Sequence, residues 1–219
     1  MIGQAVRRSG GRPTAQAAAV LETAIIGHAT AAFLAEGYAA TTIEVIARTC
    51  GVAKRTIYAR WNGKPALFRA VLERLITKWM STAGDWEDAE TLEATLKAAA
   101  DDILAVALTP EAIALHRLII AECGRFPELP VMLHQAGVNR GAMRIATLLN
   151  RGIARGDLPP QDTAFAAEQF MNMLLAGPQR RALGLGQPFN RDQIGVWRDN
   201  AVSLFLFGAG SLRLQRNTN

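Results

Sequence analysis

The sequence predicts an all-α protein. Apolar residues recur at three- and four-residue spacing in successive segments, and proline and glycine fall mainly between those segments. Strand-like alternation, internal repeats and low-complexity tracts are not visible along the 219 residues. Half of the residues are hydrophobic, which provides a substantial core. We expect about nine helices, divided between a small domain over residues 1–64 and a larger helical bundle over residues 65–219.

The residues responsible for the net charge lie in the N-terminal third of the chain. Residues 1–64 contain eight Lys and Arg against three Asp and Glu, whereas the remaining 155 residues contain sixteen of each. The net charge of +5 therefore belongs entirely to the first domain. This polarisation favours a polyanionic partner bound by that domain, although a solvated basic surface has the same composition.

Cysteine and histidine are sparse and scattered. Cys50 and Cys123 lie far apart, and His28, His116 and His134 do not cluster, so we predict neither a disulfide nor a metal site, and no cofactor. No nucleophile–base pair or carboxylate dyad is visible, which argues against an enzyme. No apolar stretch approaches the roughly 18 residues of a membrane helix and no secretory signal is visible, so we expect a cytoplasmic protein without a membrane partner.

The first domain is expected to contain three helices. The first runs from Thr14 to Glu36 and ends at Gly37, which suits a C-terminal cap. The second opens at Thr41–Glu44, where a threonine and a carboxylate stand at the spacing of a capping box. Its apolar residues fall at positions 0, 3, 4 and 7 and form one buried stripe: Ile43, Ile46, Ala47 and Cys50.

A glycine turn separates the second helix from a short basic third helix. Gly51 occupies the turn, where a residue that tolerates positive φ is needed. In the third helix Ile57 and Trp61 are four residues apart and are expected to face the core with Val52. The side chains left outside are cationic or hydrogen-bonding: Lys54, Arg55, Thr56, Tyr58 and Arg60. A helix with this surface suits the major groove of DNA.

The motif residues of this domain follow one another as Thr41-Thr42, Ile46-Ala47, Cys50-Gly51-Val52, Thr56, Tyr58, Trp61 and Lys64-Pro65-Ala66-Leu67, after a Gly11-Arg12-Pro13 arm. In this order and spacing, residues 41–68 resemble the DNA-binding region of the TetR family of bacterial repressors. Three positions depart from the family pattern: Cys50 for alanine, Ala53 for serine and Trp61 for phenylalanine. The change at Ala53 removes a capping hydroxyl worth about 1 kcal/mol to the third helix.

The resemblance implies that the first domain binds operator DNA through eight side chains: Arg12, Thr42, Lys54, Arg55, Thr56, Tyr58, Arg60 and Lys64. Lys54 and Arg55 are expected to choose the bases, and the others to hold the phosphate backbone. Residues 1–13 are either a disordered tail or a basic arm that orders on DNA.

The second domain is expected to begin with a helix that has Pro65 in its first turn. The buried face of that helix is predicted to consist of Leu67, Phe68, Val71, Leu72 and Leu75. Further helices are expected over Asp88–Leu108, from a start at Thr109-Pro110-Glu111, over Glu128–Arg155 with an end at Gly156, and over Asp162–Leu175 and Arg191–Leu214.

This helical body resembles the C-terminal domains of the same family more loosely, through His116-Arg117-Leu118 with Glu122, Phe126-Pro127-Glu128 and the closing segment 201–206. The resemblance implies a homodimer in which the last two long helices meet those of the partner through Met171, Leu174, Leu175, Trp197, Ala201, Leu204, Phe205 and Gly208. It also implies a pocket for a lipophilic ligand, lined by Trp79, Met80, Trp86, His116, Ile120, Cys123, Met143 and Phe170. Ordinary core packing is the alternative for these residues.

Taken together, the resemblance implies a ligand-responsive repressor that binds a palindromic operator as a dimer and is released by a small lipophilic effector. Three alternatives stay open on the sequence. One is a transcriptional activator of the same fold. Another is a helical small-molecule-binding protein or enzyme with a vestigial DNA-binding head, and the last is an architectural protein that binds DNA without regard to sequence.

Overall fold

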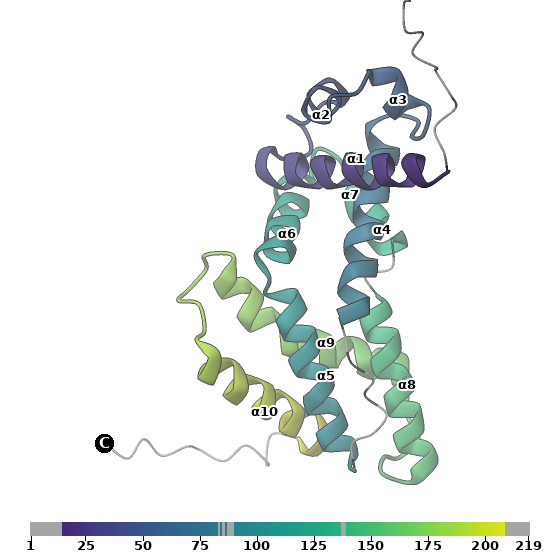
Figure 1. Cartoon of the computed structure of the whole chain (residues 1–219). Helices are drawn as coiled ribbons and strands as arrows, with labels where there is room; N and C mark the ends of the chain where they lie inside the picture. Colours follow the sequence, from purple (N-terminus) through teal and green to yellow (C-terminus); the bar gives the residue numbers. More distant parts are fainter. Residues whose placement is uncertain (1–14, 83, 85, 87–89, 137–138, 209–219) are drawn as a thin grey trace, which may run out of the picture. The chain divides into compact units, whose positions relative to one another are not determined.

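A computed structural model describes residues 15–82, 84, 86, 90–136 and 139–208 (Figure 1). Every regular element in this part of the chain is a helix, which confirms the predicted all-α class. The ten helices are α1 (Ala15–Glu36), α2 (Ile43–Thr49), α3 (Lys54–Tyr58), α4 (Lys64–Thr82), α5 (Leu92–Ala107), α6 (Pro110–Glu122), α7 (Glu128–Gln135), α8 (Arg140–Arg155), α9 (Thr163–Ala182) and α10 (Arg191–Phe207).

The chain divides into two compact units, Met1–Val71 and Leu72–Asn219, and the division falls inside α4. The sequence places the domain boundary earlier, between residues 64 and 65, where α4 begins. The first two turns of α4 belong to the first unit because Leu67, Phe68 and Val71 are buried in its core. The face predicted for this helix is buried, including Leu72 and Leu75 in the second unit.

Three aromatic rings form the centre of the first unit. The Phe68 ring of α4 meets Phe33 of α1 edge-on at 5.0 Å between centroids and meets Tyr38 at 5.1 Å. Tyr38 follows the C-terminus of α1, where Gly37 adopts a φ of +87°. Aromatic rings at such angles and distances stabilise a core beyond the area that they bury. This cluster fixes α1 and the segment after it against the start of α4.

The second helix begins one residue later than the predicted capping box requires. Thr42 is the N-cap, and its Oγ1 accepts a hydrogen bond from the Val45 amide at 3.3 Å. Thr41 is buried instead, with Oγ1 within 2.8 Å of the Gly37 carbonyl oxygen and 3.2 Å of the Ala32 carbonyl oxygen. The predicted role of Thr41 is therefore wrong: its hydroxyl donates to backbone carbonyls in the last turns of α1 and at Gly37, and does not cap α2.

Helix α1 is long and apolar enough, by length and composition alone, to cross a membrane. The expectation that no stretch approaches that length is therefore wrong on this criterion. The composition of α1 has another physical cause, because Ile25, Ala29 and Phe33 are fully buried in the core of the first unit. The opposite face is rich in exposed alanine, which favours the helix without burying side-chain area.

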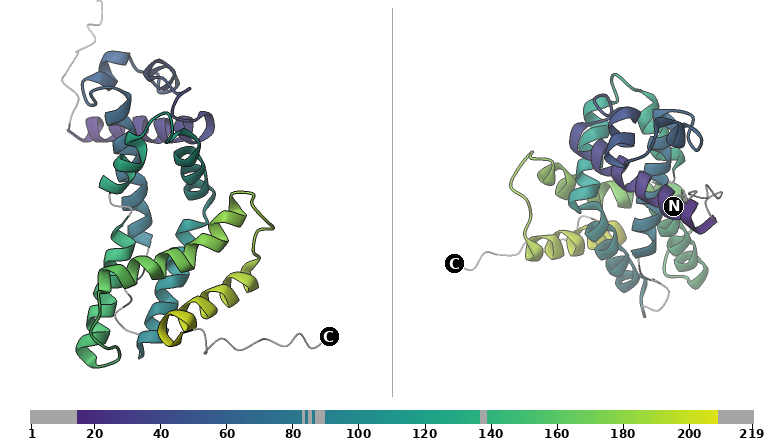
Figure 2. Two further views of the ribbon diagram at one scale, coloured as in Figure 1. Left: turned by 180° about the vertical axis from the view of Figure 1, so that it is seen from behind. Right: turned by 45° about the horizontal axis from the view of Figure 1, so that its top comes forward.

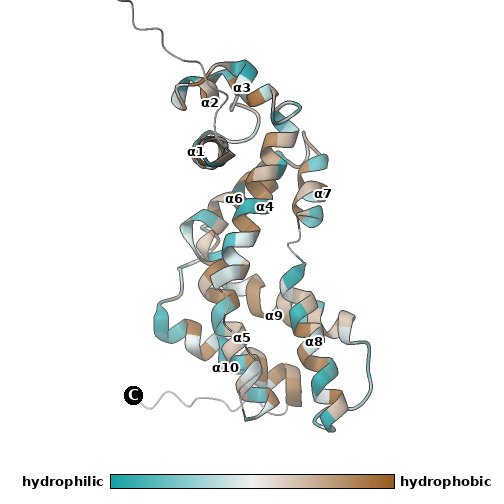
Figure 3. Cartoon of the chain, turned by 45° about the vertical axis from the view of Figure 1, so that its right-hand side comes forward, coloured by the Kyte–Doolittle hydropathy of each residue, from teal (hydrophilic) through white to brown (hydrophobic). Residues whose placement is uncertain are grey.

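The core of the second unit lies between α5, α8, α9 and α10. Helix α8 contributes Ile145, Leu148 and Leu149 from one face, and its polar and apolar residues alternate at the helical period (Figure 3). Helix α10 returns along α9 after residues 183–190, so that the two form a helical hairpin (Figure 2). Gly156 ends α8 with a φ of +83°, as the sequence predicts.

Three predicted helices in the second unit differ from those observed, and one of them is the last, which ends at Phe207 with Gly208 as its C-cap and not at Leu214. The single helix expected over Glu128–Arg155 is divided into α7 and α8, with Ala136 as the C-cap and Asn139 as the N-cap. The sequence between these caps contains glycine, which is a poor residue for a helix interior. Helix α9 continues to Ala182, well beyond the predicted end at Leu175, and it contains Pro178.

Pro178 is tolerated inside α9 because a side chain of α10 replaces the missing backbone donor. Proline has no N–H to bond the carbonyl four residues earlier, which is that of Leu174. The indole Nε1 of Trp197 donates to this carbonyl at 2.9 Å. The same indole lies directly on Gly177, where a Cβ would overlap the ring. Proline, glycine and tryptophan together therefore set the approach of α9 and α10.

We predict that Gly177→Ala destabilises the second unit by about 1–3 kcal/mol, because the new methyl group forces the Trp197 indole off α9. Urea unfolding followed by circular dichroism measures this change. Gly124→Ala is the control, since a Cβ there meets nothing within 4 Å and the backbone is not left-handed. Equal stability of the two variants would show that the indole does not need the glycine.

Candidate functional site

The first unit contains a helix-turn-helix built from α2 and α3. Gly51 makes the turn with a φ of +65°, and its amide bonds the Arg48 carbonyl at 3.1 Å. The Val52 amide then bonds the Ala47 carbonyl at 3.0 Å, which redirects the chain into α3. Ile46 and Ile57 are fully buried, and Trp61 is 9% exposed, so the two helices are held by a shared apolar core.

The opposite side of α3 carries the residues predicted to contact DNA. Lys54, Arg55 and Tyr58 are exposed, and the large Tyr58 side chain is 53% accessible. Thr56 and Arg60 are partly buried, and the Arg60 guanidinium donates to the Thr56 carbonyl at 3.1 Å. Five of the eight predicted side chains thus come from one short helix and the residues that follow it.

Lys54 is paired with a carboxylate that sequence reasoning assigned only to helix capping. The Lys54 ammonium donates to Oε1 of Glu44 in the first turn of α2. This hydrogen bond is the main reason that the pKa of Glu44 lies below its usual value. The pair is solvent-exposed, with each side chain 54% accessible, so it contributes little to stability. It holds the predicted base-reading ammonium beside a negative charge.

Three other predicted DNA contacts have different surroundings. Lys64 directs its ammonium to the Tyr38 carbonyl at 2.9 Å and lies 4.5 Å from the centroid of the Tyr38 ring. It therefore supports the segment before α2, which the sequence did not predict. Thr42 uses its oxygen to cap α2, although its hydroxyl hydrogen can still donate to a phosphate. Arg12 lies outside the described residues.

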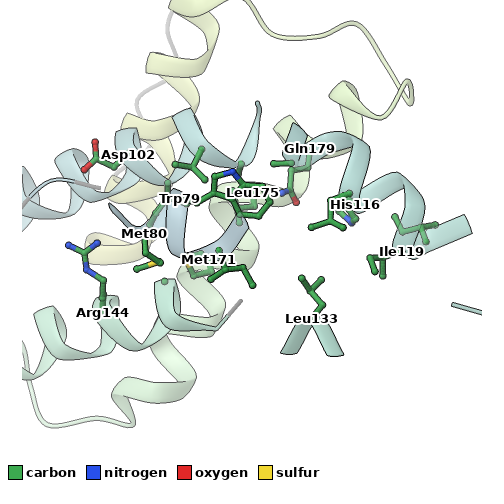
Figure 4. A pocket seen from close by; sticks show the side chains of 18 of the residues that line it. Trp79, Met80, Asp102, His116, Ile119, Leu133, Arg144, Met171, Leu175 and Gln179 are labelled. Atoms are coloured by element: carbon green, nitrogen blue, oxygen red, sulfur yellow. The ribbon is translucent and has the colours of Figure 1, made fainter. Parts of the chain in front are cut away.

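The second unit contains a cavity of about 420 Å³ with a mainly apolar lining. Side chains from α4 through α9 contribute to it. In Figure 4, Asp102 and Arg144 lie at one end and His116, Ile119 and Leu133 at the other, with Trp79, Leu175 and Gln179 between them. The volume lies within the range of small-molecule sites in proteins.

Five of the eight residues predicted for the pocket line this cavity: Trp79, Met80, Trp86, His116 and Ile120. The other three lie elsewhere. Phe170 is fully buried and packs edge-on against Phe205 at 5.0 Å, inside the core. Met143 is 68% exposed on α8, and Cys123 caps the end of α6 with Sγ 3.4 Å from the Ile120 carbonyl.

Sequence reasoning missed most of the remaining lining, which includes Asp102, Arg144, Met171, Leu175 and Gln179. Met171 and Leu175 were predicted for the dimer interface, and with Gln179 they recur every four residues along α9. That period is a signal for one helix face, but it does not reveal which partner the face meets. Met171 and Leu175, which the sequence analysis assigned to the contact with a partner subunit, therefore line the cavity within one chain.

The other residues predicted for the dimer interface are also largely used within one chain. Leu174 and Ala201 are buried, the Trp197 indole lies on α9, and Phe205 packs on Phe170. Leu204 is partly buried and Gly208 is exposed at the end of α10. The large apolar side chains that these two helices leave exposed are instead Phe165, Val196 and Phe207.

Both charged side chains in the cavity lining are engaged by the segment after α4. The Asp102 carboxylate accepts hydrogen bonds from the Gly84 amide at 2.7 Å and from the Trp86 Nε1 at 2.8 Å. Arg144 donates to the Gly84 carbonyl at 2.8 Å, and its guanidinium lies 3.8 Å from the centroid of the Trp86 ring. Burial lowers the pKa of His116, which favours the neutral form of this imidazole.

Two family descriptions match the chain over most of its length. Residues 25–71 match "Bacterial regulatory proteins, tetR family", and residues 94–208 match "AefR-like transcriptional repressor, C-terminal domain". The chain belongs to the TetR family. The family and fold that the sequence predicts are therefore confirmed, with the helix-turn-helix in the first match and most of the cavity in the second.

Individual TetR-family proteins resemble the chain along most of its length. The HTH-type transcriptional repressor ComR of Escherichia coli (strain K12) is 28% identical over 181 residues, which cover 80% of this chain and 83% of ComR. Two solved structures each have a TM-score of 0.74 and cover 86% of this chain and 96% of their own. One is a TetR-family regulator from Mesorhizobium loti MAFF303099, 30% identical, and the other is the Flavonoid-responsive Regulator FrrA, 27% identical.

TetR-family proteins are transcriptional regulators, which bind operator DNA as dimers and respond to small molecules. This chain is a DNA-binding transcriptional repressor of that family, in which ligand-responsive repression is typical.

We predict that Ala53→Ser stabilises the first unit by about 1 kcal/mol. Ala53 is the N-cap of α3, has extended backbone angles and provides no side-chain hydrogen bond, so a serine oxygen there can accept from a free amide of the first turn. Urea unfolding of the first unit measures the gain. Ala59→Ser, at the other end of α3, offers no such amide and is the control. Equal effects of the two serines would contradict the capping argument.

Proposed function

We propose that this protein is a cytoplasmic repressor that binds a palindromic operator as a homodimer and leaves it when a small, mainly apolar effector occupies the cavity of the second unit. The observation that carries this proposal is the presence, in one TetR-family chain, of an exposed basic α3 and an apolar cavity of about 420 Å³. The first supplies DNA contacts and the second supplies a place for the controlling molecule.

In the proposed complex, α3 of each subunit enters the major groove. Lys54 and Arg55 reach base edges from the first turn, while Tyr58 and Arg60 hold phosphates from the residues that follow. Thr42 and Thr56 add hydroxyl donors, and Lys64 acts from the start of α4, where it also supports Tyr38. Arg12 belongs to the N-terminal arm and is proposed to reach the DNA from there.

We assign dimerisation to the α9–α10 hairpin. Three large apolar side chains of this hairpin, Phe165, Val196 and Phe207, are between 41% and 62% exposed within one chain. Burial of such groups is the main source of stability in homodimer interfaces. Two subunits joined in this way place two recognition helices on one operator, with half-sites about one helical turn apart.

Helix α4 is the proposed route from the effector to the DNA. Its residues Ile76, Trp79 and Met80 line the cavity, while Leu67 and Phe68, about two turns earlier in the same helix, lie in the core of the helix-turn-helix unit. An effector that binds one position of α4 more tightly than another shifts the population toward the form with lower operator affinity. FrrA is named as flavonoid-responsive, which supports an aromatic and mainly apolar effector for this chain as well.

The proposal is tested by selecting bound DNA from a random pool and measuring affinity for the selected sequence. A specific repressor prefers it over random DNA by about 10³-fold or more at a fixed salt concentration. The selected site should be palindromic, and an apolar compound that binds the cavity should lower the affinity. Equal affinity for selected and random DNA would instead support the architectural alternative.

We predict that Arg55→Ala lowers affinity for the selected operator by about 1–3 kcal/mol and relaxes preference at one base position. The physical reason is that the Arg55 side chain is exposed in the first turn of α3, from which it can reach a base edge. Fluorescence anisotropy of labelled operator measures the loss. Arg117→Ala removes an exposed arginine from α6 and should leave the affinity unchanged. An equal loss in both variants would point to net charge alone.

We predict that Glu44→Gln raises affinity for random DNA by up to about fivefold and narrows the ratio of specific to non-specific affinity. The substitution removes the negative charge beside Lys54 and releases its ammonium. Anisotropy titrations with random DNA at several salt concentrations measure the change. Glu22→Gln, which alters the net charge equally from an exposed position on α1, is the control. The same gain in both variants would exclude a special role for the pair.

A further inference from the structure

The cavity wall contains one buried hydrogen-bond donor that has no acceptor. The indole Nε1 of Trp79 is buried and unpaired, and it is the only side-chain nitrogen or oxygen of this kind in the described part of the chain. Two other tryptophans satisfy their indoles: Trp86 donates to Asp102 and Trp197 to the Leu174 carbonyl. Folded proteins pair nearly all buried donors, because an unpaired one lowers stability. The exception therefore needs a reason.

The place of Trp79 gives that reason, because the residue lines the cavity. In Figure 4 its indole lies between the two ends of the cavity, in the same part as Leu175 and Gln179. The nearby lining is otherwise neutral, since Met80, Met171 and Leu175 are apolar and Gln179 carries an amide. A bound molecule that offers an acceptor here satisfies a donor that the protein alone leaves unpaired.

We propose that the effector is an uncharged, mainly apolar molecule with a carbonyl, ether or phenol oxygen that accepts the N–H of Trp79. This inference rests on the proposed function, and it adds the chemical group by which the cavity selects its ligand. Neighbouring atoms cover Nε1 in the structure, so the acceptor reaches it when a lining side chain moves. Met80 and Met171 are suited to this because unbranched thioether side chains change conformation easily.

The charges of the lining argue that the effector is neutral. Arg144 is the one arginine of the described lining, which contains no lysine, and it is engaged by the Gly84 carbonyl and the Trp86 ring. Asp102 likewise has two donors from Gly84 and Trp86. Both charged side chains lie at one end of the cavity, so a carboxylate or ammonium placed beside Trp79 would lose its hydration where the lining offers no opposite charge. A neutral acceptor avoids that cost.

The first test compares stability without any added compound. Trp79→Phe removes the unpaired N–H together with part of the ring, so the midpoint of urea unfolding should fall less than in a variant that loses a paired N–H and the same ring area. Trp86→Phe is the matched variant, since it removes a paired N–H and leaves Asp102 with one donor fewer, and its midpoint should fall. If Trp79→Phe lowers the midpoint as much as Trp86→Phe, the donor has a partner inside the protein and the proposal fails.

The second test uses two probes of nearly equal shape. Benzophenone has a carbonyl acceptor, and diphenylmethane has a methylene group in its place. Calorimetric titration of the full-length protein should give an affinity about tenfold higher for benzophenone. The Trp79→Phe variant should lose this preference while it still binds diphenylmethane. Equal affinities in the unsubstituted protein, or no binding of benzophenone, would overturn the proposal.

Nuclear magnetic resonance of the ¹⁵N-labelled protein identifies the group directly. The chain has four tryptophans, and the indole N–H signal that disappears in Trp79→Phe belongs to Trp79. Benzophenone should shift this signal downfield, as expected on formation of a hydrogen bond, and diphenylmethane should not. Equal shifts with both probes would show that the carbonyl does not accept this proton.

The proposed function fails in a different way. If a probe binds the cavity with the expected preference but leaves operator affinity unchanged, the assignment of Trp79 stands and control of DNA binding through this cavity is wrong. If operator affinity falls equally with both probes, and the Trp79 signal shifts equally with both, control through the cavity stands and the acceptor is wrong.

Discussion

The contact of Phe68 with Phe33 and Tyr38 is the interaction on which the rest of the molecule depends. The centroid of the Phe68 ring lies 5.0 Å from that of Phe33 and 5.1 Å from that of Tyr38, so this contact brings together α1, the segment before α2 and the start of α4. Lys64 adds its ammonium to the Tyr38 carbonyl, so a basic residue at the start of α4 also supports the helix-turn-helix. Two turns along the same helix, about 12 Å from Phe68, Ile76 already faces the cavity. One helix thus contributes residues to the core of the helix-turn-helix unit and to the lining of the cavity.

Helix α9 has a similar double role in the second unit. Met171, Leu175 and Gln179 face the cavity, whereas Leu174, Gly177 and Pro178 face α10. Because the Trp197 indole replaces the hydrogen bond that Pro178 cannot make, α10 is tied to a fixed place on α9. A change in the cavity that moves α9 must therefore move α10, or else break that bond and leave a buried carbonyl unpaired. Dense interiors of this kind transmit displacement instead of absorbing it.

The sequence predicts the first unit better than the second because its signals are local. Gly51, the buried residues Ile43, Ile46 and Ala47, and the exposed residues of α3 all follow from spacing within twenty residues. Cys50, the fourth residue predicted for that buried stripe, is only partly buried and is the C-cap of α2. Its error at Thr41 arises because the carbonyls that this hydroxyl bonds belong to α1 and Gly37. In the second unit, the helical period shows that Met171 and Leu175 lie on one apolar face of a helix. An apolar face of this kind can line a cavity, pack in the core or contact a dimer partner, and the period does not distinguish these. Phe170, Trp197 and Phe205 were assigned to other surfaces for that reason, whereas Trp79 and Met80 happened to lie where the family resemblance puts a pocket.

In the proposed mechanism, the short length of α3 allows a small movement to control DNA binding. The helix has five residues and lacks a side-chain cap, so one subunit offers few base contacts, and Lys54 is already engaged by Glu44. In the proposed dimer, the operator affinity is then the combined effect of two helix-turn-helix units that each bind one half-site weakly. Binding of one unit raises the effective concentration of the other at its half-site. When the separation of the two helix-turn-helix units no longer matches the spacing of the half-sites, the second unit loses this gain in effective concentration. An effector therefore does not need to alter α3 itself, because a change in α4 that prevents simultaneous contact removes most of the affinity.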